Sequence, residues 1–180
     1  MVIIGQNVTY QYDEKIGVFY EQIIDCPGKS KTELHQQISK YFAVNSVKLR
    51  YSDDNEIYAT GKFKTKFKFI FLIFYHTKIF DCVYDIKINI KENKIRYRFT
   101  NFVLVYTHFN ITTNSWYGYY GSFGWSTTMI PAEIPTRKVN DLYKQGLTQK
   151  RRLLFPSMNK NINVFVDVFK NVINENEDDW

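Results

Sequence analysis

Hydrophobic and polar residues alternate most regularly over residues 82–102. The apolar residues at every second position are Tyr84, Ile86, Ile88 and Ile90, and then Ile95, Tyr97 and Phe99. Most of the positions between them are charged or amide residues. With Glu92-Asn93 as a two-residue loop, this pattern predicts a β-hairpin with one apolar and one charged face. In that register Ile90 faces Ile95 and Lys87 faces Arg98. We expect the apolar face to form the floor of the core.

The alternation changes parity after Phe99. Asn101 falls on the apolar parity, and Phe102, Leu104 and Tyr106 then occupy that face instead. An extra residue in one strand shifts parity in this way, so the sequence predicts a β-bulge near Thr100-Asn101.

The segment before the hairpin predicts a strand, a helix and further strands. Residues 17–26 are β-branched and aromatic and end at a Pro-Gly turn, as is typical of a strand. Ser30 and Glu33 have the spacing of a capping box, and an apolar stripe at helical spacing follows over residues 31–43. We therefore expect an amphipathic helix that lies on the sheet.

Two more strands are predicted between this helix and the hairpin. Val47, Leu49 and Tyr51 alternate with basic residues, and residues 56–64 form the next strand after an Asp-Asp-Asn turn. Gly61 lies inside that strand, which indicates a bulge or a close neighbour such as the helix.

The C-terminal part predicts two helices. Val139, Leu142 and Tyr143 before Gly146 indicate a short helix with a glycine cap. After Pro156, Ser157 is the expected cap of a last helix over residues 157–174. Its apolar stripe consists of Met158, Ile162, Phe165, Val166, Phe169, Val172 and Ile173. We expect this helix to cover the apolar face of the hairpin.

Residues 67–75, FKFIFLIFY, lack alternation because both faces would be apolar. A strand covered on both sides, or a loop against the core, would explain this pattern. A partner or dimer interface and a membrane-surface or lipid contact are the alternatives. Phe69, Phe71 and Phe74 are the candidate contact residues of this stretch.

A second aromatic segment lies within residues 107–135, where glycines separate tryptophans and tyrosines. We expect an ordered irregular loop lying on the domain. Its aromatic side chains either pack on one another or form a stacking surface for a carbohydrate or peptide. Trp116, Tyr119 and Trp125 are its candidate contact residues.

Composition fits one folded domain. The chain has 180 residues, of which 44% are hydrophobic and 18% aromatic, and this aromatic content favours a sheet. We expect an N-terminal extension over residues 1–16 and a single domain over residues 17–175. Within the domain we expect a sheet core (17–106), an aromatic-rich insertion (107–156) and the last helix (157–174).

The net charge of +6 suits a polyanion or an anionic membrane, although such a surplus is also ordinary for a soluble protein. The charged face of the hairpin carries the candidate anion-binding residues Lys87, Lys94, Arg96 and Arg98. An ordinary solvated face is the alternative. Nucleic acid is not favoured as a partner, because the aromatic residues lie on the opposite face from these cations.

The sequence contains no recognisable catalytic constellation, so we predict no enzymatic activity and no cofactor. His35, His76 and His108 fall in three different predicted elements, and no nucleophile elbow or phosphate-binding glycine loop is present. Cys26 and Cys82 have no metal-ligand spacing. They are either a disulfide pair or two buried thiols.

Three segments resemble a Bacteroidota family of domains of unknown function that is described as having a TATA-binding-protein-like fold. They are residues 20–42, the strand around residues 61–63, and residues 86–102. The Pro-Gly-Lys-Ser turn at residues 27–30 and the Arg-Tyr-Arg end of the hairpin at residues 96–98 are the most recognisable features.

The resemblance covers about residues 18–106 and implies an α+β fold of order β-α-β4-α. Its antiparallel curved sheet would grip both helices on one face. The resemblance implies exported or envelope proteins and supplies no catalytic residue, because none is established for the family. It does not imply DNA binding either, since a shared fold is not a shared function. Residues 1–6, MVIIGQ, are similar to the tail of an apolar export segment, which agrees with export. Residues 67–80 and 116–125 depart from the family pattern.

From these features we expect an interaction or scaffold module of the cell envelope, with contact surfaces at residues 67–80 and 116–125. Its partner would be an unknown protein or a second copy. A hydrophobic ligand or lipid held between sheet and helix is one alternative. An anionic polymer on the basic hairpin face is the other.

Overall fold

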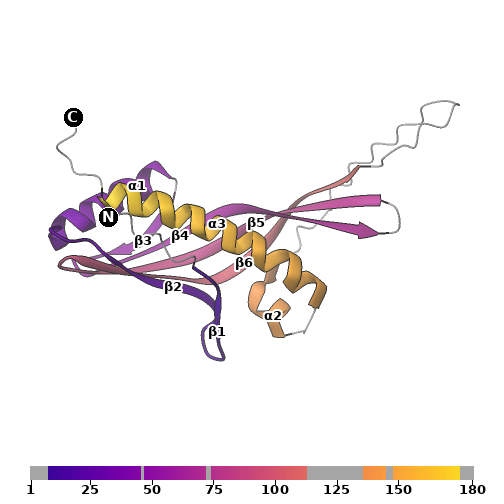
Figure 1. Ribbon diagram of the computed structural model, residues 1–180, viewed down its shortest axis with the longest axis horizontal. Coiled ribbons are helices and arrows are strands. Elements are labelled where there is room, and N and C mark those ends of the chain that lie inside the picture. Colours follow the sequence, from indigo (N-terminus) through magenta and orange to yellow (C-terminus); the bar gives the residue numbers. More distant parts are fainter. Residues whose placement is uncertain (1–7, 46, 72–73, 113–135, 145–147, 175–180) are drawn as a thin grey trace, which may run out of the picture.

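The computed structural model describes residues 8–45, 47–71, 74–112, 136–144 and 148–174 (Figure 1). Side chains are described up to Thr65 in β4, from Phe80 in β5, up to Val105 in β6 and from Leu154 in α3. The elements in chain order are β1 (Gln11–Asp13), β2 (Gly17–Asp25), α1 (Lys31–Val44), β3 (Lys48–Ser52), β4 (Glu56–Phe71), β5 (Phe74–Lys91), β6 (Lys94–Thr112), β7 (Thr136–Lys138), α2 (Val139–Lys144) and α3 (Thr148–Asn174).

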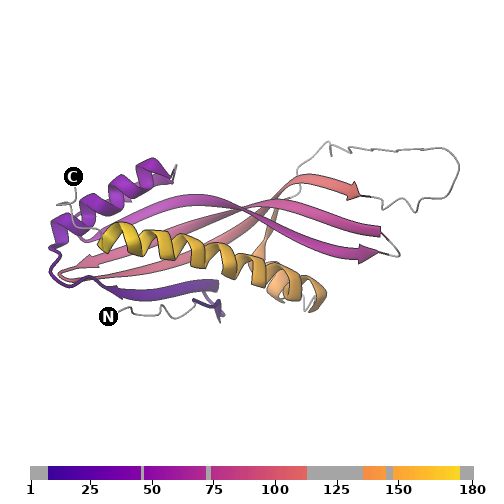
Figure 2. The same cartoon turned by 45° about the horizontal axis from the view of Figure 1, so that its top comes forward.

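The strands form one antiparallel sheet in the order β1-β2-β6-β5-β4-β3, with β7 also paired to β6. Helices α1 and α3 lie on the same face of this sheet (Figure 2). The β5–β6 hairpin occupies the centre, and its predicted register is confirmed, because Ile90 pairs with Ile95 and Lys87 with Arg98. The α+β fold with both helices on one face of an antiparallel sheet is therefore confirmed.

The predicted bulge is present in β6. Asp85 pairs with Thr100, whereas Val83 pairs with Val103, so β6 contains one extra residue between these pairs. Asn101 has a φ of 53°, in the left-handed region. Phe102 and Leu104 are buried after the bulge, as the parity change predicts.

The two-residue turn of the hairpin is held by Asn93, whose φ is 62°. Its side-chain Oδ1 accepts a hydrogen bond of 2.8 Å from the Gly28 backbone N–H. Its carbonyl accepts from Cys26 N–H at 2.7 Å, and its own N–H donates to the Lys29 carbonyl at 3.1 Å. The turn thus ties the hairpin to the segment that leads into α1.

We predict that Asn93→Ala lowers the free energy of unfolding by about 2 kcal/mol, because alanine is strained at positive φ and cannot accept from Gly28. Asn93→Gly is the matched control, since glycine adopts this φ freely and loses only the side-chain hydrogen bond. Urea unfolding of both variants measures the difference. Equal losses would contradict a role for the backbone conformation.

The core lies between the sheet and the two helices. From the hairpin it receives the predicted apolar face, and from α3 the buried side chains of Met158, Ile162, Val166, Phe169 and Ile173. In α1 the capping box of Ser30 and Glu33 is present, and Leu34, Ile38, Tyr41 and Phe42 are buried as predicted. The last helix therefore covers the hairpin floor, as the sequence indicates.

Gly61 has a close neighbour, but that neighbour is not the helix. A Cβ built at Gly61 would lie 2.4 Å from the Tyr84 hydroxyl oxygen, and Tyr84 is its direct partner on β5. The pairing of β4 with β5 continues through Gly61 without a register shift, so no bulge is present there. Glycine makes room for the Tyr84 ring.

Helix α3 is longer than the sequence pattern predicts. It begins at Thr148, not at residue 157, and contains Pro156 within it. Leu154 and Phe155 before the proline are buried together with Met158 after it. This continuous apolar stripe favours one helix although proline removes a backbone hydrogen bond. Ser157 is accordingly not a cap: its Oγ accepts a hydrogen bond of 2.7 Å from Thr65 on β4.

Two further boundaries and the exposure of one strand differ from the expectation. Residues 8–16 are not a separate extension, because β1 pairs with β2 and Val8 is buried. Strand β6 continues to Thr112, whereas the predicted sheet core ended at residue 106. Strand β3 forms as predicted, but Leu49 and Tyr51 are exposed because β3 is at the edge of the sheet.

Candidate functional site

The far ends of the three longest strands form a separate part of the sheet, which we call the distal arm (residues 66–71, 74–79 and 108–112). Within the arm Lys66 pairs with Ile79 and Phe71 with Phe74. Ile79 in turn pairs with His108, and Tyr75 with Thr112. Figures 1 and 2 show these ends diverging from α3 and extending past its N-terminal end. No described helix covers the arm.

Both edges of the distal arm are open in the described part of the chain. Strand β3 pairs with β4 only up to Thr60, and β7 pairs with β6 only at residues 103–105. A strand edge without a partner presents a row of backbone donors and acceptors that another chain can pair with.

The arm contains the three candidate residues of the first aromatic segment. Phe71 and Phe74 are direct partners, and Phe69 pairs with His76. Residues 67–71 and residues 74–75 lie in paired strands. The alternative of a loop against the core is therefore wrong. The candidates of the second segment, Trp116, Tyr119 and Trp125, lie outside the described residues.

Strand β4, one of the two outer strands of the arm, has a lysine at every second position over residues 62–68. Lys62 and Lys64 are exposed, and Lys66 and Lys68 continue the same spacing into the arm. Neither Lys62 nor Lys64 forms an ion pair with another described residue. Lysines on an edge strand oppose pairing between two identical edges, since the like charges repel.

The outer face of the β5–β6 hairpin carries the four predicted anion-binding residues, and three of them are ion-paired. The Glu21 carboxylate lies 2.7 Å from Arg96 Nε and 2.8 Å from Arg98 Nη2. Lys87 Nζ lies 2.7 Å from a Glu56 carboxylate oxygen. Much of the charge that the sequence pattern placed on this face is therefore neutralised within the sheet.

Lys94 differs from these three residues. It pairs with Lys91 on β5 and with Asp25 on β2. No ion pair of Lys91 or Lys94 occurs among the described side chains, and both are exposed. The unneutralised charge of the face is therefore concentrated at the turn end of the hairpin.

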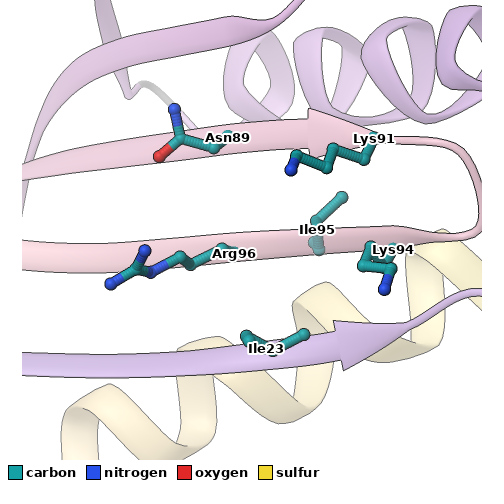
Figure 3. Close-up of a pocket in the computed structure, with 6 residues that line it drawn as sticks. All are labelled: Ile23, Asn89, Lys91, Lys94, Ile95 and Arg96. Atoms are coloured by element: carbon teal, nitrogen blue, oxygen red, sulfur yellow. The ribbon is translucent and has the colours of Figure 1, made fainter.

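A shallow groove of about 400 Å³ lies at this end, as Figure 3 shows. Its lining residues are Ile23, Asn89, Lys91, Lys94, Ile95 and Arg96. Ile23 is 58% exposed, which gives the groove an apolar wall beside its cations. Lys91 was not among the predicted anion-binding residues, although the hairpin register alone sets it opposite Lys94. Ile23 was missed because only the long-range β2–β6 pairing brings it there.

Glu21 gives this face a testable pH dependence. Burial alone would raise the pKa of Glu21, but hydrogen bonds and charge from Arg96 and Arg98 outweigh burial and hold it below its usual value of 4.5. A lowered carboxyl pKa contributes stability above the unfolded-state pKa, and this contribution is lost as the pH falls through the folded-state pKa.

We predict that Glu21→Gln lowers the free energy of unfolding at pH 7 by about 0.5–1 kcal/mol, because solvent screens these partly exposed pairs. The difference between the two proteins should shrink as the pH falls below the ordinary glutamate pKa and through the lowered folded-state pKa, where the wild-type carboxylate becomes protonated. Denaturant unfolding at several pH values measures it. A difference that stays constant with pH would show that Glu21 acts through packing alone.

Aromatic rings fill the space between the sheet and the last helix. The Phe165 ring lies 5.3 Å from Phe99, 5.4 Å from Tyr41 and 5.8 Å from Phe169, measured between centroids. Tyr84 lies 5.2 Å from Phe99. Such ring packing leaves little room for a lipid in this part of the core, which disfavours the carrier alternative.

Structural contacts surround the side chains of His35, Cys26 and Cys82. His35 shares a hydrogen bond of 2.7 Å with Ser52 and links α1 to β3. Cys26 and Cys82 are separate buried thiols and form no disulfide. Burial raises the pKa of Cys26 to about 11 and raises the pKa of Cys82 further. Over the described residues, no group of three His, Cys, Asp or Glu side chains is placed to hold a metal. No described helix is long and apolar enough to cross a membrane.

Comparison with curated proteins found no match. Two solved structures are similar along nearly their whole length. One is a DUF4468 family protein from Bacteroides ovatus, 13% identical, with a TM-score of 0.57, covering 95% of this chain and 93% of that one. The other is a TBP-like protein from Parabacteroides distasonis, 14% identical, with a TM-score of 0.59, covering 92% of this chain and 98% of that one.

The family comparison agrees with both structures. Residues 20–104 match the family described as "Domain of unknown function (DUF4468) with TBP-like fold". This range includes the Pro-Gly-Lys-Ser turn and the β5–β6 hairpin on which the resemblance was based. Residues 20–104 are therefore similar to the DUF4468 family, and the chain adopts a TBP-like fold.

Proposed function

We propose that this chain is a non-enzymatic interaction module of the cell envelope that binds a protein partner through the distal arm. One observation carries the proposal: three paired strands continue past the helices with both edges open among the described strands. A sheet in water normally has at least one covered face, and an open edge invites strand addition. A partner would cover one face of the arm and add a strand to its open edge.

The lysine spacing supports an acidic partner over a second copy of the chain. Lys62, Lys64, Lys66 and Lys68 give the outer strand a single sign of charge. Two copies pairing along this strand would bring these charges together, whereas an acidic segment would neutralise them. The partner surface is therefore expected to be rich in Asp and Glu.

Charge reversal in the arm tests this proposal. Lys66→Glu/Lys68→Glu should reduce partner recovery in quantitative affinity purification at least tenfold, because the acidic partner would then be repelled. Lys40→Glu/Lys48→Glu changes the net charge equally but lies on α1 and β3, so it should have little effect. Both variants should keep the thermal midpoint of the wild type, since surface substitutions are usually nearly neutral.

Two results would contradict the proposal. Equal losses in the two variants would assign the effect to net charge and not to the arm. A stable dimer of the purified protein that dissociates on Lys66→Glu/Lys68→Glu would assign the arm to self-association.

A further inference from the structure

We infer that the groove at the β5–β6 turn is a binding site for a phosphate group, separate from the distal arm. The two regions are at opposite ends of β5, which has 18 residues, and a strand of that length spans about 55 Å. A ligand in the groove therefore does not depend on the arm or on its partner.

The charges at the turn are arranged for an external anion. Lys91 and Lys94 are direct cross-strand partners, so residues of like charge lie opposite each other at some cost in stability. Arg96 lies in the same groove, and the one Glu21 carboxylate that it contacts is shared with Arg98. Asp25, the partner of Lys94 on β2, is the nearest acidic residue by register and makes no ion pair with it. A dianion between the two lysines would relieve their repulsion.

The polar neighbours of the groove leave its cations available. Asn89 Nδ2 donates a hydrogen bond of 3.1 Å to Glu56, and the same carboxylate oxygen pairs with Lys87. The Glu56 carboxylate is thus bound to Asn89 and Lys87 and not to Lys91 or Lys94. Glu92 in the turn accepts a 3.3 Å hydrogen bond from the Lys31 backbone N–H.

The size and lining of the groove define the ligand class. A volume of about 400 Å³ is within the range of small-molecule sites, which is roughly 300–1,000 Å³. The two ammonium groups of Lys91 and Lys94, which form no ion pair with a described side chain, favour the doubly charged phosphate over a singly charged carboxylate. The exposed Ile23 side chain can contact a short apolar group on the ligand. We therefore assign a phosphate ester or pyrophosphate to this site.

A titration with pyrophosphate at constant ionic strength tests the inference. Amide resonances of residues 89–96 should shift, with a dissociation constant below about 1 mM. Lys91→Gln/Lys94→Gln should weaken binding at least tenfold. The control Lys40→Gln/Lys48→Gln removes the same charge from α1 and β3 and should bind as the wild type does. Both lysine pairs are exposed, so folding should persist, and the groove variant should unfold at an equal or higher temperature.

Two further probes identify the source of the phosphate group. Phenyl phosphate that binds in the groove, with no binding to phosphatidic acid vesicles, would assign the site to a soluble ester. The reverse result would assign it to a lipid headgroup. No shift of residues 89–96 with pyrophosphate at about 10 mM would overturn the inference, because so weak a site has no use at cellular concentrations. Equal weakening in the control variant would also overturn it.

Discussion

Replacement of Phe169 by alanine is expected to lower the free energy of unfolding by about 3–5 kcal/mol, because it removes a buried ring and leaves a cavity. Phe169 is fully buried. Its ring lies 5.3 Å from Tyr41, 6.3 Å from Phe42 and 5.8 Å from Phe165. The side chain therefore joins α1 to α3 above the sheet, and its loss weakens both helices at once.

The adjacent Val168 provides the control. Val168 is 44% exposed on the same helix, so Val168→Ala should cost less than about 1 kcal/mol. Chemical unfolding of the two variants measures both values. A loss below about 1 kcal/mol for Phe169→Ala would contradict the packing of α3 against α1 and the sheet.

Gly61→Ala is expected to lower the free energy of unfolding by about 1–3 kcal/mol, although alanine normally improves a strand. The added methyl group would lie 2.4 Å from the Tyr84 hydroxyl oxygen and 2.5 Å from Cζ of the same ring. Tyr84 cannot easily move, because its ring packs against Phe63, Phe99 and Phe102. The overlap must therefore displace a core side chain.

A double-mutant cycle separates this overlap from any intrinsic effect of alanine. In a Tyr84→Leu background the ring is absent, so Gly61→Ala should cost little or become stabilising. The coupling free energy between the two substitutions should reach about 1 kcal/mol or more. Additive effects would show that Tyr84 is not the reason for glycine at this position.

The hairpin and its bulge were predictable because they follow from local alternation. Every second position is apolar from Tyr84 to Ile90 on one arm and from Ile95 to Phe99 on the other. One parity change at Asn101 locates the extra residue. The start of α3 was not predictable from a local rule, because proline usually ends a helix. Burial of Leu154 and Phe155 against the rest of the fold outweighs that preference.

The candidate sites show the same division between local and long-range information. The aromatic stretch of residues 67–75 has no alternation, so its sequence could not distinguish a paired arm from a loop. Residues 67–71 pair with the neighbouring strand β5, but Tyr75 pairs with Thr112 on β6, which is more than thirty positions away along the chain. The basic face was evident from the hairpin pattern. Its neutralisation by Glu21 was not, because that contact depends on the position of β2 in the sheet.

The most direct test of the proposed function is photo-crosslinking from the distal arm in cells that produce the protein. A photoreactive phenylalanine analogue is placed at position 69 in the arm and, as the control, at position 164, where Val164 is 56% exposed on α3. If the arm binds an acidic partner, position 69 gives a discrete adduct that Lys66→Glu/Lys68→Glu abolishes, and position 164 gives none. Adducts of the same protein at both positions, or no adduct at position 69, would contradict binding through the arm.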